Sequence, residues 1–105
     1  MLSRPFSLGV ADLLWSRRAI ASLAAQDDWL RLKNPAAADS ILREIERSAS
    51  LLAEFPDMGR RIEGTTLRCH VTRRYRFRIV YRIERRTVQV MDVMHPRRRG
   101  SEESA

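Results

Sequence analysis

The first half of the chain has the hydrophobic pattern of helices. After Ser16, side chains recur at spacings of three and four residues and form one mostly apolar face, made of Ile20, Leu23, Ala24, Asp27 and Leu30. Ser16 can accept a hydrogen bond from the first turn, as helix N-caps do. We therefore predict a helix from about Arg17 to Lys33, with Trp29 beside the apolar face in the core. Residues Val10–Ser16 could form a short first strand.

A second helix is predicted from Pro35 to about Glu54. Asn34 is a good N-cap, and proline at the first helical position loses no hydrogen bond that the helix needs. Its apolar stripe consists of Ala38, Ile41, Ile45, Ala49 and Leu52, followed by Phe55 just beyond the end. Pro56 stops the helix. The short link between the two helices predicts an antiparallel helical hairpin.

The hydrophobic period changes from 3.6 to 2 after Gly59. Residues 67–72 alternate between apolar and polar, and residues 75–83 do so most clearly of all. In that long strand one face is aromatic and aliphatic and is expected to pack on the helices, while the other is a row of arginines. The chain turns at Glu84–Thr87, and Thr87–His95 is apolar on both faces, as a covered central strand would be.

These elements predict an α+β domain of order β-α-α-β-β-β, in which the helical hairpin packs on a small, mostly antiparallel sheet. A length of 105 residues allows one domain. We expect a loose leader over residues 1–9, a single domain over 10–98 and a polar tail over 99–105. No apolar run approaches the roughly 20 residues that cross a bilayer, and the N-terminus is a poor signal peptide. A cytoplasmic protein is therefore expected.

The charge lies mainly in the second half of the chain. Residues 1–59 hold seven Lys or Arg and eight Asp or Glu, and residues 60–105 hold thirteen Arg and five Asp or Glu, so a net of −1 and a net of +8 make +7. The basic half favours an acidic partner, either nucleic acid or an acidic protein segment. Cys69 is the single cysteine. It has no metal-ligand partners at useful spacing, so we interpret it as a buried structural residue.

Several segments together resemble the RelE/ParE superfamily of toxins from type II toxin–antitoxin systems, and the ParE branch most. The most specific is F-P-x-M-G-R (Phe55–Arg60) after the second helix. Next are the Y-R-I ending of the long strand (Tyr81–Ile83) and V-x-H-x-x-R (Val93–Arg98). The segments WSRRAIASL (Trp15–Leu23) and NPAAADSILREI (Asn34–Ile45) fit the same pattern. The likeness covers nearly the whole chain after residue 10.

The resemblance implies a curved antiparallel sheet with a helical hairpin on one face. It implies a bacterial protein silenced by a cognate antitoxin, with a heterotetramer as a possible assembly. It also implies toxic action without a metal or other cofactor. The ParE branch is associated with poisoning of DNA gyrase, and the RelE branch cuts mRNA in the ribosomal A site.

The two branches make different demands on the residues. Metal-independent RNA cleavage needs a base, an acid and cations that stabilise the phosphorane, and arginine can serve only the last role. Matching to the RelE pattern places its basic positions at Arg68, near His70, at Arg78 and at Arg97. RelE-type enzymes carry a C-terminal tyrosine, and this chain has no tyrosine after Tyr81 and no lysine in the sheet. His95 is the main titrating candidate at that corner.

Two function classes therefore stay open, a non-catalytic gyrase inhibitor and a ribosome-dependent endoribonuclease. A member that only binds its partner is a third. His95 and Arg78 are the catalytic candidates under the nuclease hypothesis. The candidates for binding nucleic acid or a protein target are Arg68, His70, Arg76, Arg78, Arg82, Arg97 and Arg98. Each also has a structural interpretation: His95 could hold the chain turn, His70 could be a solvated strand residue, and the arginines could be an exposed polar face. The absence of a second acid–base group favours the gyrase inhibitor.

Overall fold

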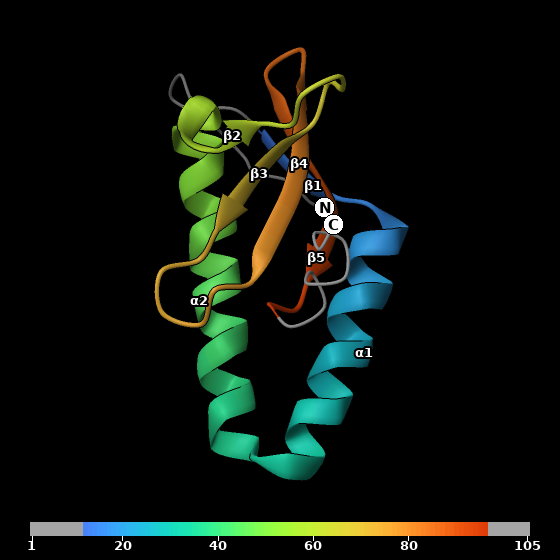
Figure 1. Cartoon of the computed structure of the whole chain (residues 1–105), viewed down its shortest axis with the longest axis vertical. Coiled ribbons are helices and arrows are strands. Elements are labelled where there is room, and N and C mark those ends of the chain that lie inside the picture. The colour runs from blue at the N-terminus through green and yellow to red at the C-terminus, as the bar shows by residue number, and fades with distance from the viewer. Residues whose placement is uncertain (1–11, 97–105) are drawn as a thin grey trace.

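The computed structural model describes residues 12–96 and shows two helices and five strands (Figure 1). In chain order the elements are β1 (Asp12–Trp15), α1 (Arg17–Lys33), α2 (Pro35–Glu54), a 3-10 turn (Pro56–Met58), β2 (Arg60–Arg61), β3 (Arg68–Val71), β4 (Arg78–Glu84) and β5 (Thr87–Met94). Both predicted helices are confirmed at their predicted ends. The short strand β2 and the 3-10 turn were not predicted.

The five strands form one mixed sheet in the order β1-β5-β4-β3-β2. Strand β1 runs parallel to β5, and every other pair is antiparallel. The order of elements confirms the α+β class, and β5 is central as predicted, between β1 and β4. Of the expected first strand, only residues 12–15 lie in the sheet, while residues 10 and 11 and the leader 1–9 lie outside the described residues.

The core lies between the helical hairpin and one face of the sheet. Helix α2 contributes Ile41, Ile45 and Leu52, and α1 contributes Ala19. Strands β4 and β5 contribute Ile79, Tyr81, Val88, Val90 and Val93, and the segment just before β4 contributes Phe77. All six are 2% exposed or less. In Figure 1 the two helices run alongside the sheet and meet at Asn34, well beyond its lower edge. The hairpin thus packs on the sheet with part of its length only.

Helix α1 is held to β5 by polar contacts as well as by apolar packing. The Ser16 side chain caps α1 by accepting from the Ala19 N–H at 3.0 Å, and donates to the carbonyl of Met91. Further along, Ser22 donates to the Asp92 carboxylate at 2.8 Å, and Gln26 donates to the carbonyl of Val93 at 2.7 Å. The apolar face of α1 is incomplete and does not by itself fix which side of the helix faces the sheet. These hydrogen bonds to β5 fix it.

The long strand begins three residues later than predicted. Residues 75–77 belong to the turn between β3 and β4, because Arg76 has a positive φ of 62°. Glu44 of α2 accepts the Arg74 and Tyr75 N–H groups at 2.6 and 3.0 Å, and Thr72 Oγ1 accepts the Phe77 N–H at 2.9 Å. The alternation of apolar and polar residues continues through this turn. For this reason the sequence pattern predicted a strand that begins three residues too early.

Three expectations about burial were wrong. Trp29, expected in the core, is 54% exposed, because α1 reaches beyond the sheet at that point. Phe55, at the end of the apolar stripe, is 57% exposed. Cys69, expected to be buried, is half-buried, and it lies opposite Val80 rather than beside the core residues. In β3 it is Arg68 and His70 that share a face with the core residues Tyr81 and Ile79.

The turn between β4 and β5 is confirmed and is conformationally costly. Its two central residues, Arg85 and Arg86, both have positive φ, 49° and 64°. A two-residue hairpin turn of this kind favours Asn-Gly, because a side chain in the left-handed region costs roughly 1–2 kcal/mol. The chain therefore uses two arginines where the backbone prefers other residues.

We predict that the double substitution Arg85→Asn with Arg86→Gly stabilises the domain. The substitutions relieve strain at two positions, while the greater conformational freedom of glycine in the unfolded chain offsets part of that gain. The net increase in the free energy of unfolding is about 1 kcal/mol. This corresponds to a rise of roughly 4–8 °C in Tm, measurable by circular dichroism. The substitution Arg85→Ala with Arg86→Ala is the control, since it removes the same charges and keeps the strain. An equal rise in both variants would trace the effect to charge.

Candidate functional site

The most specific motif of the sequence folds around the hydroxyl of Tyr81. This oxygen accepts the N–H of Gly59 at 2.8 Å and donates to the carbonyl of Pro56 at 2.6 Å. Arg68 then donates to the carbonyl of Gly59 at 2.8 Å and lies 3.3 Å from the Asp57 carboxylate. The turn after α2 is therefore fastened to β4 and β3, and burial of the phenol raises the pKa of Tyr81 above its usual value of 10.

Gly59 is required for space rather than for backbone conformation, since its φ of −80° is open to any residue. A Cβ placed there would lie 2.6 Å from the Tyr81 hydroxyl oxygen and 2.8 Å from a carbon of its ring. The glycine thus lets the turn approach the tyrosine closely enough to form both hydrogen bonds.

The candidate residues of β3 face the helices. Arg68 is opposite Tyr81 and His70 is opposite Ile79, both of which are core positions. Burial lowers the pKa of His70, and the nearby Glu44 carboxylate opposes that shift. Arg68 is occupied by the Gly59 turn. These two residues therefore do not share a surface with the arginines of β4.

Arginines gather instead on the opposite face of the sheet, which we call the arginine face. Arg78 pairs across the sheet with Val71 and Met94, and Arg82 pairs with Gln89, to which it donates a hydrogen bond at 3.2 Å. Arg60, which sequence reasoning did not select, is opposite Cys69 and so joins the same face. Only the pairing of β2 with β3 reveals this position, because a two-residue strand has no sequence period.

Cys69 lies at the centre of this arrangement. Burial raises the pKa of its thiol, and this outweighs the opposing influence of Arg78, which forms a hydrogen bond with it, and of Arg60. The thiol is therefore mostly protonated at neutral pH and is no activated nucleophile. The arginine face can bind an anion or an acidic surface, but Cys69 adds no covalent chemistry to it.

His95 lies away from the arginine face. Its ring meets Phe77 edge-on with centroids 5.1 Å apart, and meets Trp29 in the same way at 6.4 Å. Phe77 is a core residue at 2% exposure. Since Met94, the residue before His95, shares its face with Arg78, the two proposed catalytic residues lie on opposite faces of the sheet.

The remaining candidates do not complete a nuclease site within the described residues. Arg76, expected in the arginine row, is instead an exposed residue of the β3–β4 turn. Arg97 and Arg98 lie outside the described residues. No group of three or more metal-ligating side chains occurs between residues 12 and 96. Over the same range, neither helix is long and apolar enough to cross a membrane.

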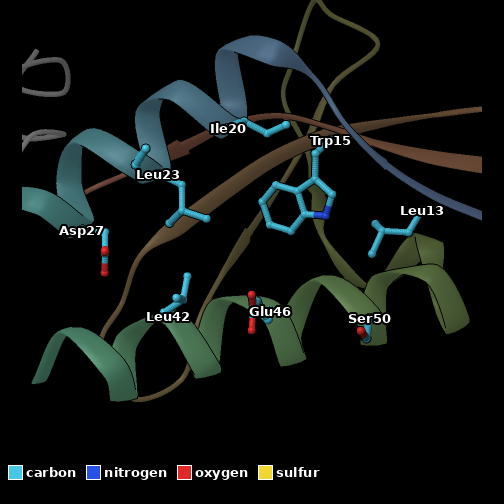
Figure 2. Close-up of a pocket in the computed structure, with 9 residues that line it drawn as sticks. Leu13, Trp15, Ile20, Leu23, Asp27, Leu42, Glu46 and Ser50 are labelled. Atoms are coloured by element: carbon cyan, nitrogen blue, oxygen red, sulfur yellow. The ribbon is translucent and has the colours of Figure 1, made fainter. Parts of the chain in front are cut away.

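The two helices and β1 enclose an apolar groove of about 510 Å³ (Figure 2). Leu23 of α1 points toward Leu42 of α2, and Trp15 of β1 extends into the space between the two helices. Ile20 and Ala24 of α1 also line the groove. Two carboxylates, Asp27 and Glu46, line it from opposite helices, and its other lining residues are Leu13 and Ser50. Ile20 is 55% exposed, a large fraction for an isoleucine that lines a groove. The groove leads to β1, an edge strand of the sheet.

Comparison with known proteins agrees with this fold and assigns the family. Residues 13–100 match the family of ParE toxins of type II toxin–antitoxin systems, parDE. Toxin RelE2 of Caulobacter vibrioides is 34% identical over 56 residues, which is 53% of this chain and 64% of that protein. A structure of the chromosomal ParDE system from P. aeruginosa superposes with a TM-score of 0.71 at 23% identity, over 79% of this chain and 92% of the other.

The chain belongs to the ParE toxin family of type II toxin–antitoxin systems. The match to 88 of its residues, from 13 to 100, establishes this, and the structural likeness supports the fold independently. Membership confirms the resemblance drawn from the sequence motifs. Because the family is defined by a toxin and its antitoxin, it also supports an antitoxin as a partner.

We predict that Tyr81→Phe destabilises the domain by about 1–3 kcal/mol, because it leaves the buried N–H of Gly59 without an acceptor. Gly59→Ala should cost about 1–3 kcal/mol through overpacking against the phenol. In the double variant the hydroxyl that would clash with the new methyl group is absent. The double variant should therefore lose less stability than the sum of the losses in the two single variants. Urea unfolding of the four proteins measures this coupling, and strict additivity would contradict it.

Proposed function

We propose that this protein is an active toxin that inhibits DNA gyrase by binding it, and that an antitoxin segment docked in the inter-helix groove neutralises it. The observation with most weight is the separation of His95 from Arg78 by the sheet. A binding toxin needs a complementary surface only, whereas a nuclease needs an acid, a base and a cation around one phosphate.

The chemistry of the described residues supports binding over cleavage. Arginine stays protonated at physiological pH, so Arg60, Arg78 and Arg82 can stabilise charge but cannot transfer a proton. His70 faces the helices with its pKa lowered by burial, and the ring of His95 packs on Phe77. Neither histidine joins the arginine face in this arrangement. We therefore assign the arginine face to recognition of an acidic surface on the target.

A ribosome-dependent endoribonuclease is the second candidate. It is favoured by one comparison, the 34% identity over 56 residues to a protein named Toxin RelE2. That match spans 64% of the relative's length, and the family model that covers residues 13–100 is that of ParE. Both gyrase and ribosomes are found in the bacterial cytoplasm, so a cytoplasmic location fits either activity.

The groove supports the antitoxin part of the proposal. Its apolar lining and the exposed Ile20 fit an amphipathic segment that buries a few aliphatic or aromatic side chains. Asp27 and Glu46 at the walls fit a basic residue in that segment. The outer edge of β1, with which no other strand of residues 12–96 pairs, lies beside the groove and allows the same segment to continue as an added strand. Two such toxin–antitoxin pairs would make the heterotetramer that the family resemblance allows.

We predict that induction of the toxin causes filamentation and DNA-damage signalling before translation falls. His95→Phe, which keeps a ring against Phe77 without a titrating group, should stay toxic, and His95→Ala should stay toxic if it folds. Under the nuclease alternative both substitutions should lower cleavage by about 10²–10⁴-fold. The deciding measurement is a gyrase supercoiling assay beside a ribosome-programmed mRNA cleavage assay on one preparation. Specific mRNA cleavage with unchanged supercoiling would reject gyrase as the target.

We predict that Arg78→Ala with Arg82→Ala weakens gyrase inhibition at least tenfold while the antitoxin still binds. Each charge at the rim of an interface contributes less binding free energy than a buried charge pair does. Both arginines are therefore substituted together. The matched control, Arg85→Ala with Arg86→Ala, removes two charges from the β4–β5 turn. Equal inhibition by both variants would show that the arginine face does not touch the enzyme.

We predict that Ile20→Arg weakens antitoxin binding by about 30-fold or more, the loss typical of a buried interface anchor of about 2 kcal/mol. Ile20 is 55% exposed in the free chain, so the substitution should leave the fold intact. Leu32→Arg is the control, because Leu32 is on the same helix, is 85% exposed and does not line the groove. Isothermal titration measures both affinities. Unchanged binding by Ile20→Arg would place the antitoxin elsewhere.

A further inference from the structure

A second basic surface lies outside both the groove and the arginine face. It is a polar hollow of about 200 Å³ between α2 and the β3–β4 turn. Figure 1 shows that turn beside the middle of α2. The lining residues of the hollow are Ser40, Arg43, Glu44, Arg47, Arg74 and Tyr75. We call it the α2 hollow. None of its arginines was selected from the sequence, because helix and turn meet only in the folded chain.

The fold brings these arginines together in a defined way. Arg43 and Arg47 are four residues apart on α2 and so lie one turn apart on the same side, about 6 Å along the axis. Arg74 is held against them because Glu44 accepts the N–H groups of Arg74 and Tyr75. The hollow is therefore anchored by backbone hydrogen bonds and does not depend on flexible side chains alone.

The guanidinium groups of the hollow form no close ion pair within the described residues. No ion pair within 4 Å involves Arg43, Arg47 or Arg74 over residues 12–96, although the charge of Arg74 acts on the Glu44 carboxylate at longer range. Glu44 is the one acidic lining residue, and although burial raises its pKa, the hydrogen bonds from Arg74 and Tyr75 lower it overall, so it is ionised at neutral pH. Three positive charges and one negative leave a net charge of +2. Arg73 and Arg76, exposed in the same turn, add to it.

We propose that the α2 hollow binds the phosphate backbone of a nucleic-acid duplex. Guanidinium groups and the Ser40 hydroxyl donate to phosphate oxygens, and arginine does so in two-bond geometry. A single strand would need a free aromatic face for its bases. The ring of Tyr75 provides none, since Tyr75 is half-buried and the Arg74 guanidinium covers its face at 5.0 Å. An acidic protein segment would need apolar anchors, which the hollow lacks.

The α2 hollow and the groove use different flanks of α2. The groove is lined by Leu42, Glu46 and Ser50, and the hollow by Ser40, Arg43 and Arg47. A partner in the groove therefore leaves the hollow open. The nucleic-acid proposal does not rest on the identity of the groove's occupant or on gyrase as the target.

The test measures binding of the full-length chain to a labelled 20-base-pair DNA duplex at several salt concentrations, by fluorescence anisotropy. Each phosphate contact contributes about 0.9 to the slope of log affinity against log salt. Arg43→Gln with Arg47→Gln should therefore make the slope shallower by about 2 relative to the unaltered chain. The control, Arg17→Gln with Arg85→Gln, removes the same charge elsewhere and should leave the slope within about 0.5 of the original.

Further arms use an RNA duplex, single-stranded DNA and a poly-glutamate peptide. We expect the Arg43→Gln, Arg47→Gln variant to bind duplexes more weakly than the unaltered chain does. Comparison of its affinities for the DNA duplex and the RNA duplex then shows which of the two the hollow prefers. An unchanged slope in the hollow variant would overturn the proposal. A variant that binds duplexes normally but loses poly-glutamate would overturn it in favour of an acidic protein partner. Tighter binding of single strands than duplexes through Arg43 and Arg47 would also overturn it.

Discussion

The hydroxyl of Tyr81 is the contact on which the relation between helices and sheet depends. It joins β4, at the middle of the core, to the turn that follows α2, through hydrogen bonds to Gly59 and Pro56. With Gly59 in place, the chain leaves α2, passes close under the phenol and enters β2 at Arg60, opposite Cys69. The same turn accepts a hydrogen bond from Arg68, which lies on the face of β3 opposite to the arginine face. One short motif thus fastens the hairpin to the sheet and engages one of the arginines.

The sequence predicted those parts of the fold that depend on local pattern. Both helices have capping residues, Ser16 and Asn34, and both side chains accept a backbone N–H three residues on, as helix caps do. The turn before Thr87 was also predicted, because the hydrophobic alternation changes there. The family followed from motifs whose order along the chain is more informative than any one of them alone.

What the sequence could not show depends on contacts between distant residues. The late start of β4 is set by Glu44, which accepts the N–H of Arg74 from thirty residues away and fastens a turn that the alternation pattern predicted as strand. The face of β3 is set by its register with β4, and a shift of one residue would exchange Arg68 and His70 with Cys69 and Val71. The exposure of Trp29 depends on how far α1 extends past the sheet. None of these is a property of a short window.

Arginine serves four distinct roles in this small domain, and the structure separates them. Arg68 stabilises the Gly59 turn, Arg78 and Arg82 line the arginine face, and Arg43 and Arg47 belong to the α2 hollow. Arg85 and Arg86 form a turn in a conformation that arginine disfavours. The positive charge of the described residues is therefore divided among separate surfaces. Under our two proposals, a protein docked in the groove leaves the arginines of the α2 hollow available to a polyanion.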